Sequence, residues 1–402
     1  MLIKKVVYTH IIPLFIALTV TFLIFNKQEV SKKKELTTNP PVVNSTNYAE
    51  HFYNENLENQ LAFSIALKNS IPVIIGSSEL TSGHLDALPQ NFFKNEKSFS
   101  LGHAGFQSLA ILTSLAANRE LLQTSKITII LSPGWFEKQY SSGTSLKSFF
   151  EFCPTNYLYQ IYKDGKLDNA TKSYIKQYIY NNYDKISSPN AVIRLMSRKH
   201  IADATEAVNI PFNYIDEKEI AYMEQVDFSL TAQQTIINTL SQTKNKPYHF
   251  HLKKTNWDSL NNNSKKQFKL ISNNNSIAVN NDYYNQWLKN KPKKKMIFVE
   301  RTNNQEFKDL NALVDFLKIN KCNVQFVIMP LNTKAHENLS VLQPTINDIT
   351  NLLKSSNFKV LDMFTPNVNQ YEDGILEDIM HPYNIGWYKI DKFIIDNFND
   401  DK

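Results

Sequence analysis

Two short segments, far apart in the chain, hold residues whose types and spacing suit nucleophilic catalysis. Gly76-Ser77-Ser78 directly follows the apolar run 71–75, and Asp378 and His381 lie three residues apart near the C-terminus. A serine on a glycine turn at the end of a strand can be held exposed as a nucleophile, and a carboxylate can orient an imidazole that acts as its general base. The pattern therefore predicts a site in which Ser78, His381 and Asp378 act together.

Glycines cluster around these segments. The chain has only 9 glycines in 402 residues, and five of them fall in four short blocks: Gly76, Gly102, Gly105, Gly134 and Gly386. Glycine lets a backbone approach a ligand closely and adopt positive φ, as a pocket of N–H groups around an oxyanion requires. Any one of these blocks alone is more often an ordinary tight turn, so their value lies in the combination.

Several neighbouring residues have two interpretations. Ser78 could be a helix N-cap instead of a nucleophile, because Ser-Glu after a strand is also a helix start signal. Glu79 could be a capping or network carboxylate. His103, in the second glycine block, could line the pocket. Trp135 and Trp387 could be pocket walls, and core packing is equally plausible for both.

The elements that must position these residues alternate between apolar runs and amphipathic segments. Strands are predicted at 71–75, 126–131, 296–299, 323–329 and 358–361, and helices at 48–69, 107–122, 305–319 and 342–353. This alternation is typical of an open α/β sheet, whose ligands bind outside the carboxyl ends of the strands. The glycine blocks fall where such strands should end.

The middle of the chain loses this rhythm. Residues from about 145 to 290 are rich in Asn, Tyr, Lys and Ser, with helical stretches at 170–183 and 231–240, and we expect a mainly helical insertion that could cover the site. The lysine run 289–295 that ends this insertion is interpreted as a solvated linker in preference to a binding site. His249 and His251 alternate on one predicted strand face, but no third ligand is evident, so no metal site is expected.

The N-terminus predicts a membrane anchor. Residues 6–25 are predominantly apolar and long enough to span a bilayer, and no small-x-small cleavage site follows. We therefore predict an uncleaved single helix within residues 1–30, a polar stalk over 31–47, and a catalytic domain over 48–402. Lysines flank both sides of the apolar run, so charge alone does not fix its orientation.

Composition bears on the class of partner and on the state of the two cysteines. The net charge of +6 is modest, which makes nucleic acid an unlikely partner class on charge alone, although a positive surface also suits an anionic polymer. The only cysteines, Cys153 and Cys322, have no metal-type spacing. Two buried thiols are the simpler interpretation, and one disulfide stays open if the domain lies outside the cytoplasm.

The pattern as a whole resembles a known group of enzymes. A serine after an N-terminal strand, a glycine in a second block and Asp-x-x-His near the end resemble the SGNH (GDSL-type) hydrolase superfamily. Within that group, Gly-Ser-Ser-Glu-Leu at 76–80, Ser-Pro-Gly-Trp-Phe at 132–136, and Asp-x-x-His followed by Gly-Trp-Tyr-Lys-Ile-Asp at 386–391 resemble the DltD family of D-alanyl transfer proteins. The fold that this implies is an open, mostly parallel sheet of the flavodoxin-like type, with the helical insertion and one N-terminal transmembrane helix.

The resemblance also implies roles for individual residues. Ser78 matches the nucleophile, with Ser77 as the one-residue alternative; Asp378 and His381 match the acid and base. The N–H groups of Ser78 and Gly105 match the oxyanion hole. The third block departs from the wider superfamily, because Ser-Pro-Gly-Trp-Phe stands where an oxyanion asparagine is expected. One oxyanion donor is therefore unassigned.

The implied activity is transfer of D-alanine through a seryl ester to teichoic acid or another cell-surface polymer, outside the membrane and without metal or nucleotide cofactor. Implied partners are a membrane O-acyltransferase and a D-alanyl carrier protein. Two other functions stay open: a membrane-anchored esterase or thioesterase with the same triad, and a non-catalytic scaffold that binds a carrier or polymer.

Overall fold

The computed structural model describes residue 13 and residues 57–81, 92, 98–197, 217–224 and 254–398. Apart from residue 13, the predicted anchor at 6–25 lies outside these residues. So do the stalk, the first nine residues of the predicted helix 48–69, the helix at 231–240 and the histidines 249 and 251. Within the described ranges, no helix is both long enough and apolar enough to span a bilayer.

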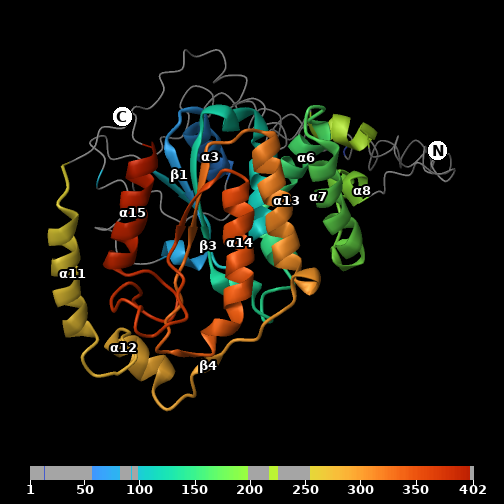
Figure 1. The fold of residues 1–402 in the computed structure, drawn as a ribbon. Coiled ribbons are helices and arrows are strands. Elements are labelled where there is room, and N and C mark those ends of the chain that lie inside the picture. The colour runs from blue at the N-terminus through green and yellow to red at the C-terminus, as the bar shows by residue number, and fades with distance from the viewer. Residues whose placement is uncertain are drawn as a thin grey trace, which may run out of the picture.

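A five-stranded parallel sheet forms the centre of the molecule (Figure 1). Its strands are β1 (Pro72–Ile75), β2 (Phe99–Leu101), β3 (Lys126–Leu131), β5 (Val324–Ile328) and β7 (Lys359–Asp362), in the order β2-β1-β3-β5-β7. All residues of the first four strands are buried, as expected when helices cover both faces of a parallel sheet. The chain moves outward from β1 to β2 and in the other direction from β3 to β7, so the order reverses between β1 and β3. This switch point is where doubly wound sheets bind ligands.

Successive side chains of each strand pack on opposite faces of the sheet. Val73, Ile127 and Phe326 share one hydrophobic cluster with the helices α3 (Leu57–Lys68), α4 (Ser108–Ala117), α13 (Gln305–Ile319) and α14 (Gln343–Ser355). Ile74 and Val327 belong to a second cluster, which contains the apolar residues of α15 (Asn384–Phe398). The sheet is therefore covered on both sides, and only its edges are open to ligands.

The middle of the chain is helical where it is described, and it divides into two groups (Figure 1). The helices α5 (Leu146–Phe152), α6 (Thr155–Lys163), α7 (Asn169–Asn182) and α8 (Ala191–Ser197) pack beside α4. In the second group, α11 (Trp257–Ile271) packs against α15, and α12 (Asn281–Tyr283) continues into a π-helical turn, η9 (Tyr284–Leu288). The first group thus forms a flank of the domain, and the second lies against α15 and the loop before it.

Short elements complete the chain. The strands β4 (Lys294–Lys295) and β6 (His336–Glu337) pair in parallel as a separate two-stranded sheet. The 3₁₀ turns are η3 (Ser78–Thr81), η6 (Arg119–Thr124), η7 (Pro133–Phe136), η8 (Tyr183–Lys185), η10 (Arg301–Asn303) and η11 (Leu339–Leu342).

Most predicted elements agree with the structure within one or two residues, and β3 and α13 have the predicted bounds. The predicted helix 107–122 ends earlier, at Ala117, and continues as η6. The predicted strand 296–299 is wrong, because the pairing residues are Lys294 and Lys295. At Met296 the Asn338 side chain replaces a strand partner: Asn338 Oδ1 accepts the Met296 N–H at 3.1 Å, and Asn338 Nδ2 donates to the Met296 carbonyl at 3.0 Å.

A buried acidic pair joins α13 to its neighbours. Glu306 Oε1 accepts from the N–H and the hydroxyl of Ser108 on α4, at 3.0 and 2.6 Å. Asp309 Oδ1 accepts from the Tyr174 hydroxyl of α7 at 2.6 Å and from Gln305 Nε2 at 2.8 Å. Both carboxyl groups are almost fully buried. Burial raises the pKa of Asp309 to about 6, and burial together with the charge of Asp309 raises the pKa of Glu306.

This pair makes stability depend on pH. A carboxyl whose folded pKa is raised favours folding most below its unfolded pKa, near 3.8 for Asp309, and this contribution is lost as pH rises through about 6. We expect Asp309→Asn, which resembles the protonated acid, to reduce the loss of stability between pH 4 and pH 8 by on the order of 1–2 kcal/mol. Urea unfolding at several pH values measures this. Asp315→Asn, an exposed position of the same helix, is the control, and equal pH profiles for Asp309→Asn and the unmodified chain would contradict the assignment.

Candidate active site

The turns after β1 and β2 are joined through Ser77. The Ser77 hydroxyl donates to the His103 carbonyl at 3.1 Å and accepts from the Gly105 N–H at 3.2 Å. The close approach requires glycine at position 102, where φ is +147° and an added Cβ would lie 1.8 Å from the Gly76 carbonyl oxygen. The first two glycine blocks of the sequence are therefore in direct contact.

Glu79 connects the same turn to two further segments. Its Oε2 accepts the Ser77 N–H at 3.1 Å, and its carboxyl also forms a hydrogen bond with Ser132, at the end of β3. The side chain is 1% exposed. Burial raises the pKa of Glu79, opposed by its hydrogen bonds and by the positive charge of His381. The electrostatic interaction with His381 means that the C-terminal segment lies beside the turn after β1.

Asp378 and His381 form a hydrogen-bonded pair. His381 Nδ1 lies 2.6 Å from Asp378 Oδ2, while Asp378 Oδ1 accepts the N–H groups of Met380 and His381, both at 2.8 Å. A carboxylate can only accept, so His381 Nδ1 carries the hydrogen and the neutral ring has its lone pair on Nε2. This is the tautomer that a general base needs.

The surroundings of the pair favour its charged form. Burial would raise the pKa of Asp378, but its hydrogen bonds with His381 and Met380 and the charge of His381 hold the pKa below its usual value. Burial alone would lower the pKa of His381; the hydrogen bond and charge of Asp378, with the charges of Glu79 and Glu377, raise it. His381 is consequently a stronger base than an isolated histidine.

The loop that carries the pair is held from two sides. Asn332, buried just beyond the end of β5, donates its N–H to the Ile379 carbonyl at 3.1 Å and its Nδ2 to the Asp378 carbonyl at 3.4 Å. The Asn280 N–H donates to the Glu377 carbonyl at 2.8 Å. An isolated bridge between Leu376 and Pro382 closes the loop at its base. These contacts fix the pair without using its reactive atoms.

The remaining predicted residues lie around this centre in different settings. Ser78 begins η3 and is half-buried, and His103 is half-buried in the second block. Trp135 is buried within η7. Trp387 has no exposed surface and belongs to the core cluster with Ile74 and Leu80, which is the core-packing alternative that the sequence left open.

Sequence reasoning missed two contributors to this site. Ser132, which bonds Glu79, and Asn332, which holds the Asp378 loop, each follow a strand of the central sheet. The rule that ligands and functional groups gather at the carboxyl ends of parallel strands could have identified both. Tyr283 is a third neighbour: burial and the charge of Asp378 raise its pKa to about 12.

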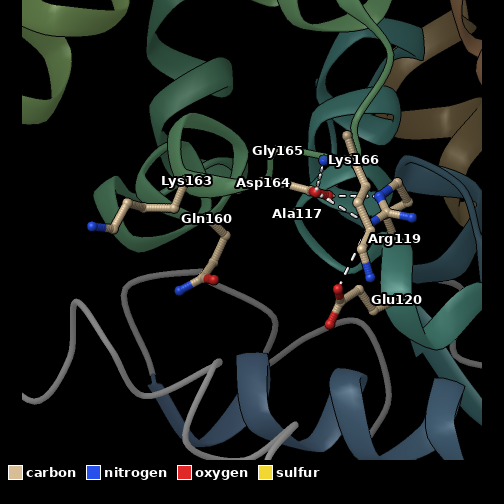
Figure 2. Close-up of a pocket in the computed structure, with 9 residues that line it drawn as sticks. Ala117, Arg119, Glu120, Gln160, Lys163, Asp164, Gly165 and Lys166 are labelled. Carbon is tan, nitrogen blue, oxygen red and sulfur yellow. Dashed lines mark hydrogen bonds and ion pairs between the residues drawn. The ribbon is translucent and has the colours of Figure 1, made fainter.

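Two pockets in the described part of the chain lie away from these blocks. One, of about 280 Å³, lies between α4, η6 and α6 (Figure 2). Its guanidinium is already paired: Arg119 Nε and Nη2 lie 2.6 and 3.1 Å from the two oxygens of Asp164, as the dashed lines show. The other, of about 490 Å³, lies where β5 and β7 begin, at the opposite edge of the sheet from Ser78.

Neither a metal centre nor a disulfide joins the described elements. No group of three or more His, Cys, Asp or Glu side chains with metal-binding geometry occurs among the residues that the structure describes. Cys153 and Cys322 are both buried and free.

Known proteins share this chain's pattern over most of its length. The family model "DltD protein" matches residues 45–399. The protein named Protein DltD of Lacticaseibacillus rhamnosus is 24% identical over 345 residues, which cover 81% of this chain and 77% of that protein. Protein DltD of Staphylococcus aureus is 20% identical over 304 residues, covering 75% of this chain and 73% of that one. The segments that build the site, from Gly76 to Gly386, all lie within the matched range, and the chain belongs to the DltD protein family.

Proposed function

We propose that this protein is a serine acyltransferase that moves D-alanine to a hydroxyl of teichoic acid, or of another cell-surface polymer, through a seryl ester on Ser78. The single observation that carries the proposal is the Asp378–His381 pair at 2.6 Å, whose imidazole interacts electrostatically with Glu79, the residue next to Ser78. Membership of the DltD family supports the choice of acyl group.

The contacts of the two serines favour Ser78 over Ser77 as the nucleophile. Ser77 is 4% exposed, and its hydroxyl already joins the first glycine block to the second, where it donates to the His103 carbonyl and accepts from the Gly105 N–H. Its removal would disturb the turn. Ser78 is half-buried and begins η3, so a substrate can reach it.

In the proposed reaction, Ser78 Oγ attacks the carbonyl carbon of the D-alanyl donor while His381 Nε2 takes its proton. The tetrahedral intermediate collapses, the donor leaves with that proton, and a D-alanyl ester of Ser78 remains. The acceptor hydroxyl then loses its proton to His381 and attacks the ester; as the bond between Ser78 Oγ and the acyl carbon breaks, His381 returns that proton to Ser78 Oγ and the enzyme is regenerated. Asp378 stays ionised throughout and stabilises the imidazolium.

The oxyanion would be stabilised by backbone N–H groups of Ser78 and Gly105. In the structure the Gly105 N–H donates to Ser77 Oγ at 3.2 Å, so Ser77 Oγ and the substrate oxygen would share this one donor. Gly105 has φ of +92°, and a Cβ there would lie 2.5 Å from Ser148 Oγ, which makes the N–H direction specific to glycine.

The wider setting is part of the same proposal. The domain would be an SGNH-type fold, held outside the membrane by the apolar residues 6–25, with the catalytic unit over 48–402. It would receive D-alanine from a pathway that contains a membrane O-acyltransferase and a D-alanyl carrier protein. The switch-point position of the site, between β1 and β3, supports the SGNH assignment.

We expect Ser78→Ala to abolish D-alanine ester incorporation into cell-surface polymers, because it removes the hydroxyl proposed to form the acyl-enzyme. The loss should be on the order of 10³-fold or more, as for other nucleophile deletions. Ester-linked D-alanine released by mild base from whole cells is the readout. Unchanged D-alanylation in these cells, with the variant protein present at normal level, would refute Ser78 as the nucleophile, and the same result in Ser77→Ala cells would indicate a scaffold.

Two comparisons sharpen this experiment. Ser77→Ala should leave a reduced but measurable activity, whereas full loss in Ser77→Ala with activity retained in Ser78→Ala would identify Ser77 as the nucleophile. The purified full-length chain should hydrolyse simple esters slowly without an acceptor, and rapid turnover in water alone would favour an esterase. Ser355→Ala, an exposed helix position, controls for expression.

The raised pKa of His381 predicts where activity is lost in acid. Since the neutral imidazole is the base, the rate should fall as pH drops through a value above the usual 6.5. Glu377→Gln removes one of the negative charges that raise this pKa and should move the acid limb to lower pH. Glu337→Gln, an exposed position, should leave the profile unchanged. A histidine titration followed by NMR checks the same shift without turnover, and an upward shift in Glu377→Gln would be the wrong sign.

A further inference from the structure

Residues 284–298, called here the lysine segment, carry a concentrated positive charge. They contain five lysines and no aspartate or glutamate, in a chain whose net charge is +6. Lys289, Lys291, Lys293 and Lys295 are exposed, and Lys294 is half-buried with its ammonium 3.6 Å from Glu137. From the sequence, the lysine run 289–295 within this segment was expected to be a solvated linker.

Large apolar side chains are exposed in and beside the same segment. Trp287 and Ile297 are each 49% exposed, Phe298 is 43% and Tyr140 is 41% exposed. A solvated linker has no physical need for such side chains, because each one keeps apolar surface in water. Exposed apolar groups gathered in one place are typical of an interaction surface.

The lysines and the apolar groups form one continuous surface. The Lys138 N–H donates to the Ile297 carbonyl at 3.1 Å, which joins the loop after η7 to the lysine segment. Lys294 Nζ lies 5.7 Å from the centre of the Tyr140 ring, and Lys291 Nζ lies 5.7 Å from that of Trp287. Cation–π contacts of this kind hold aromatic rings beside ammonium groups.

This surface belongs to the edge of the domain that carries the candidate site. At one end, Asn280 is bonded to Glu377 in the Asp378 loop, and α12 and η9 follow directly. At the other end, β4 pairs with β6, whose His336 N–H donates to the carbonyl of Asn332, the residue that holds the same loop. Figure 1 shows β4 and α12 together at the bottom of the view.

We propose that the lysine segment, with Tyr140, is a docking surface for a bilayer that contains anionic lipid. The exposed ammonium groups would pair with lipid phosphates, while Trp287, Ile297 and Phe298 enter the interfacial region. A soluble polyanion would match the lysines but would leave the isoleucine and phenylalanine in water, so the combination of charge and apolar surface favours the lipid. Carboxyl groups surround the run without interrupting it: Glu137 is buried against Lys294, Glu337 is exposed beside Lys295, and Asp282 and Glu300 are exposed just beyond the two ends of the segment, but none lies within 284–298.

This docking places the Asp378–His381 edge of the domain at the membrane surface. The inference does not depend on acyl transfer, since it rests on the charge and exposure of other residues. It would orient any chemistry at that edge toward substrates that are themselves held at the lipid surface.

The test uses the full-length chain reconstituted into vesicles, so that the N-terminal residues contribute equally to every sample. Vesicles of brominated phosphatidylcholine, with and without phosphatidylglycerol, quench tryptophan that enters the interface. The difference in quenching between the unmodified chain and the Trp287→Phe variant gives the contribution of Trp287. We expect quenching of Trp287 only when phosphatidylglycerol is present, and its loss in high salt.

Matched charge variants complete the test. The docking variant replaces four exposed lysines by glutamine: Lys289, Lys291, Lys293 and Lys295. The control replaces four exposed lysines near the opposite edge of the sheet: Lys318, Lys321, Lys354 and Lys359. Quenching should fall to the neutral-vesicle level in the first and persist in the second, with equal thermal unfolding of the two.

Two results would overturn the proposal. Quenching that is equal in neutral vesicles, or that persists in the docking variant, would show that anionic lipid does not hold this surface. Binding of inorganic polyphosphate that is lost in the docking variant, without lipid quenching of Trp287, would instead identify a site for a soluble polyanion.

Discussion

All strands of the central sheet run in one direction, and this constraint determines where chemistry can occur. Parallel strands bring their carboxyl ends to a single edge, so the turn after β1, the glycine block after β2, Ser132 after β3 and Asn332 after β5 emerge beside one another. The strand order reverses between β1 and β3, and doubly wound sheets bind their ligands at such a switch point. The Asp378–His381 loop needs only to be attached there, and Asn332 makes that attachment with its N–H and its side-chain amide.

The charges at this edge are arranged around one imidazole. Asp378 lies on one side of His381 within hydrogen-bond distance, and Glu79 interacts with it through space. The two carboxyls differ in environment: several donors hold the pKa of Asp378 low, whereas burial raises that of Glu79. Groups placed so differently can serve different purposes, with Asp378 as the permanent anion and Glu79 as the link between the strand turns and His381. Such a division would suit the proposed role of His381 as a general base.

Much of this could be predicted from the sequence, because the relevant signals are local. Buried parallel strands appear as short apolar runs and surface helices as amphipathic segments, which is why β3 and α13 have the predicted bounds. Asp-x-x-His places its two groups within reach on one loop. What could not be predicted depends on distant partners. Three buried residues form β2, too few for a periodic signal. The strand expected at 296–299 failed because Asn338, 42 residues away, occupies both backbone groups of Met296. The hydrogen bonds of Ser77, the one-residue alternative to Ser78, could not be predicted either, because their partners His103 and Gly105 lie 26 and 28 residues away.

The lysine segment is a second case in which the sequence alone could not decide between two interpretations. From the sequence, the lysine run around Pro292 was interpreted as a solvated linker in preference to a binding site, since composition does not say which neighbours face solvent. The structure separates the two, because Met296 is buried while Ile297 and Phe298, the next two residues, are both exposed. Alternation would have buried one of them, as in a half-covered strand. Two consecutive exposed apolar residues beside exposed lysines indicate that the segment is shaped for a partner that presents phosphate and hydrocarbon together, and a bilayer surface has both at one depth.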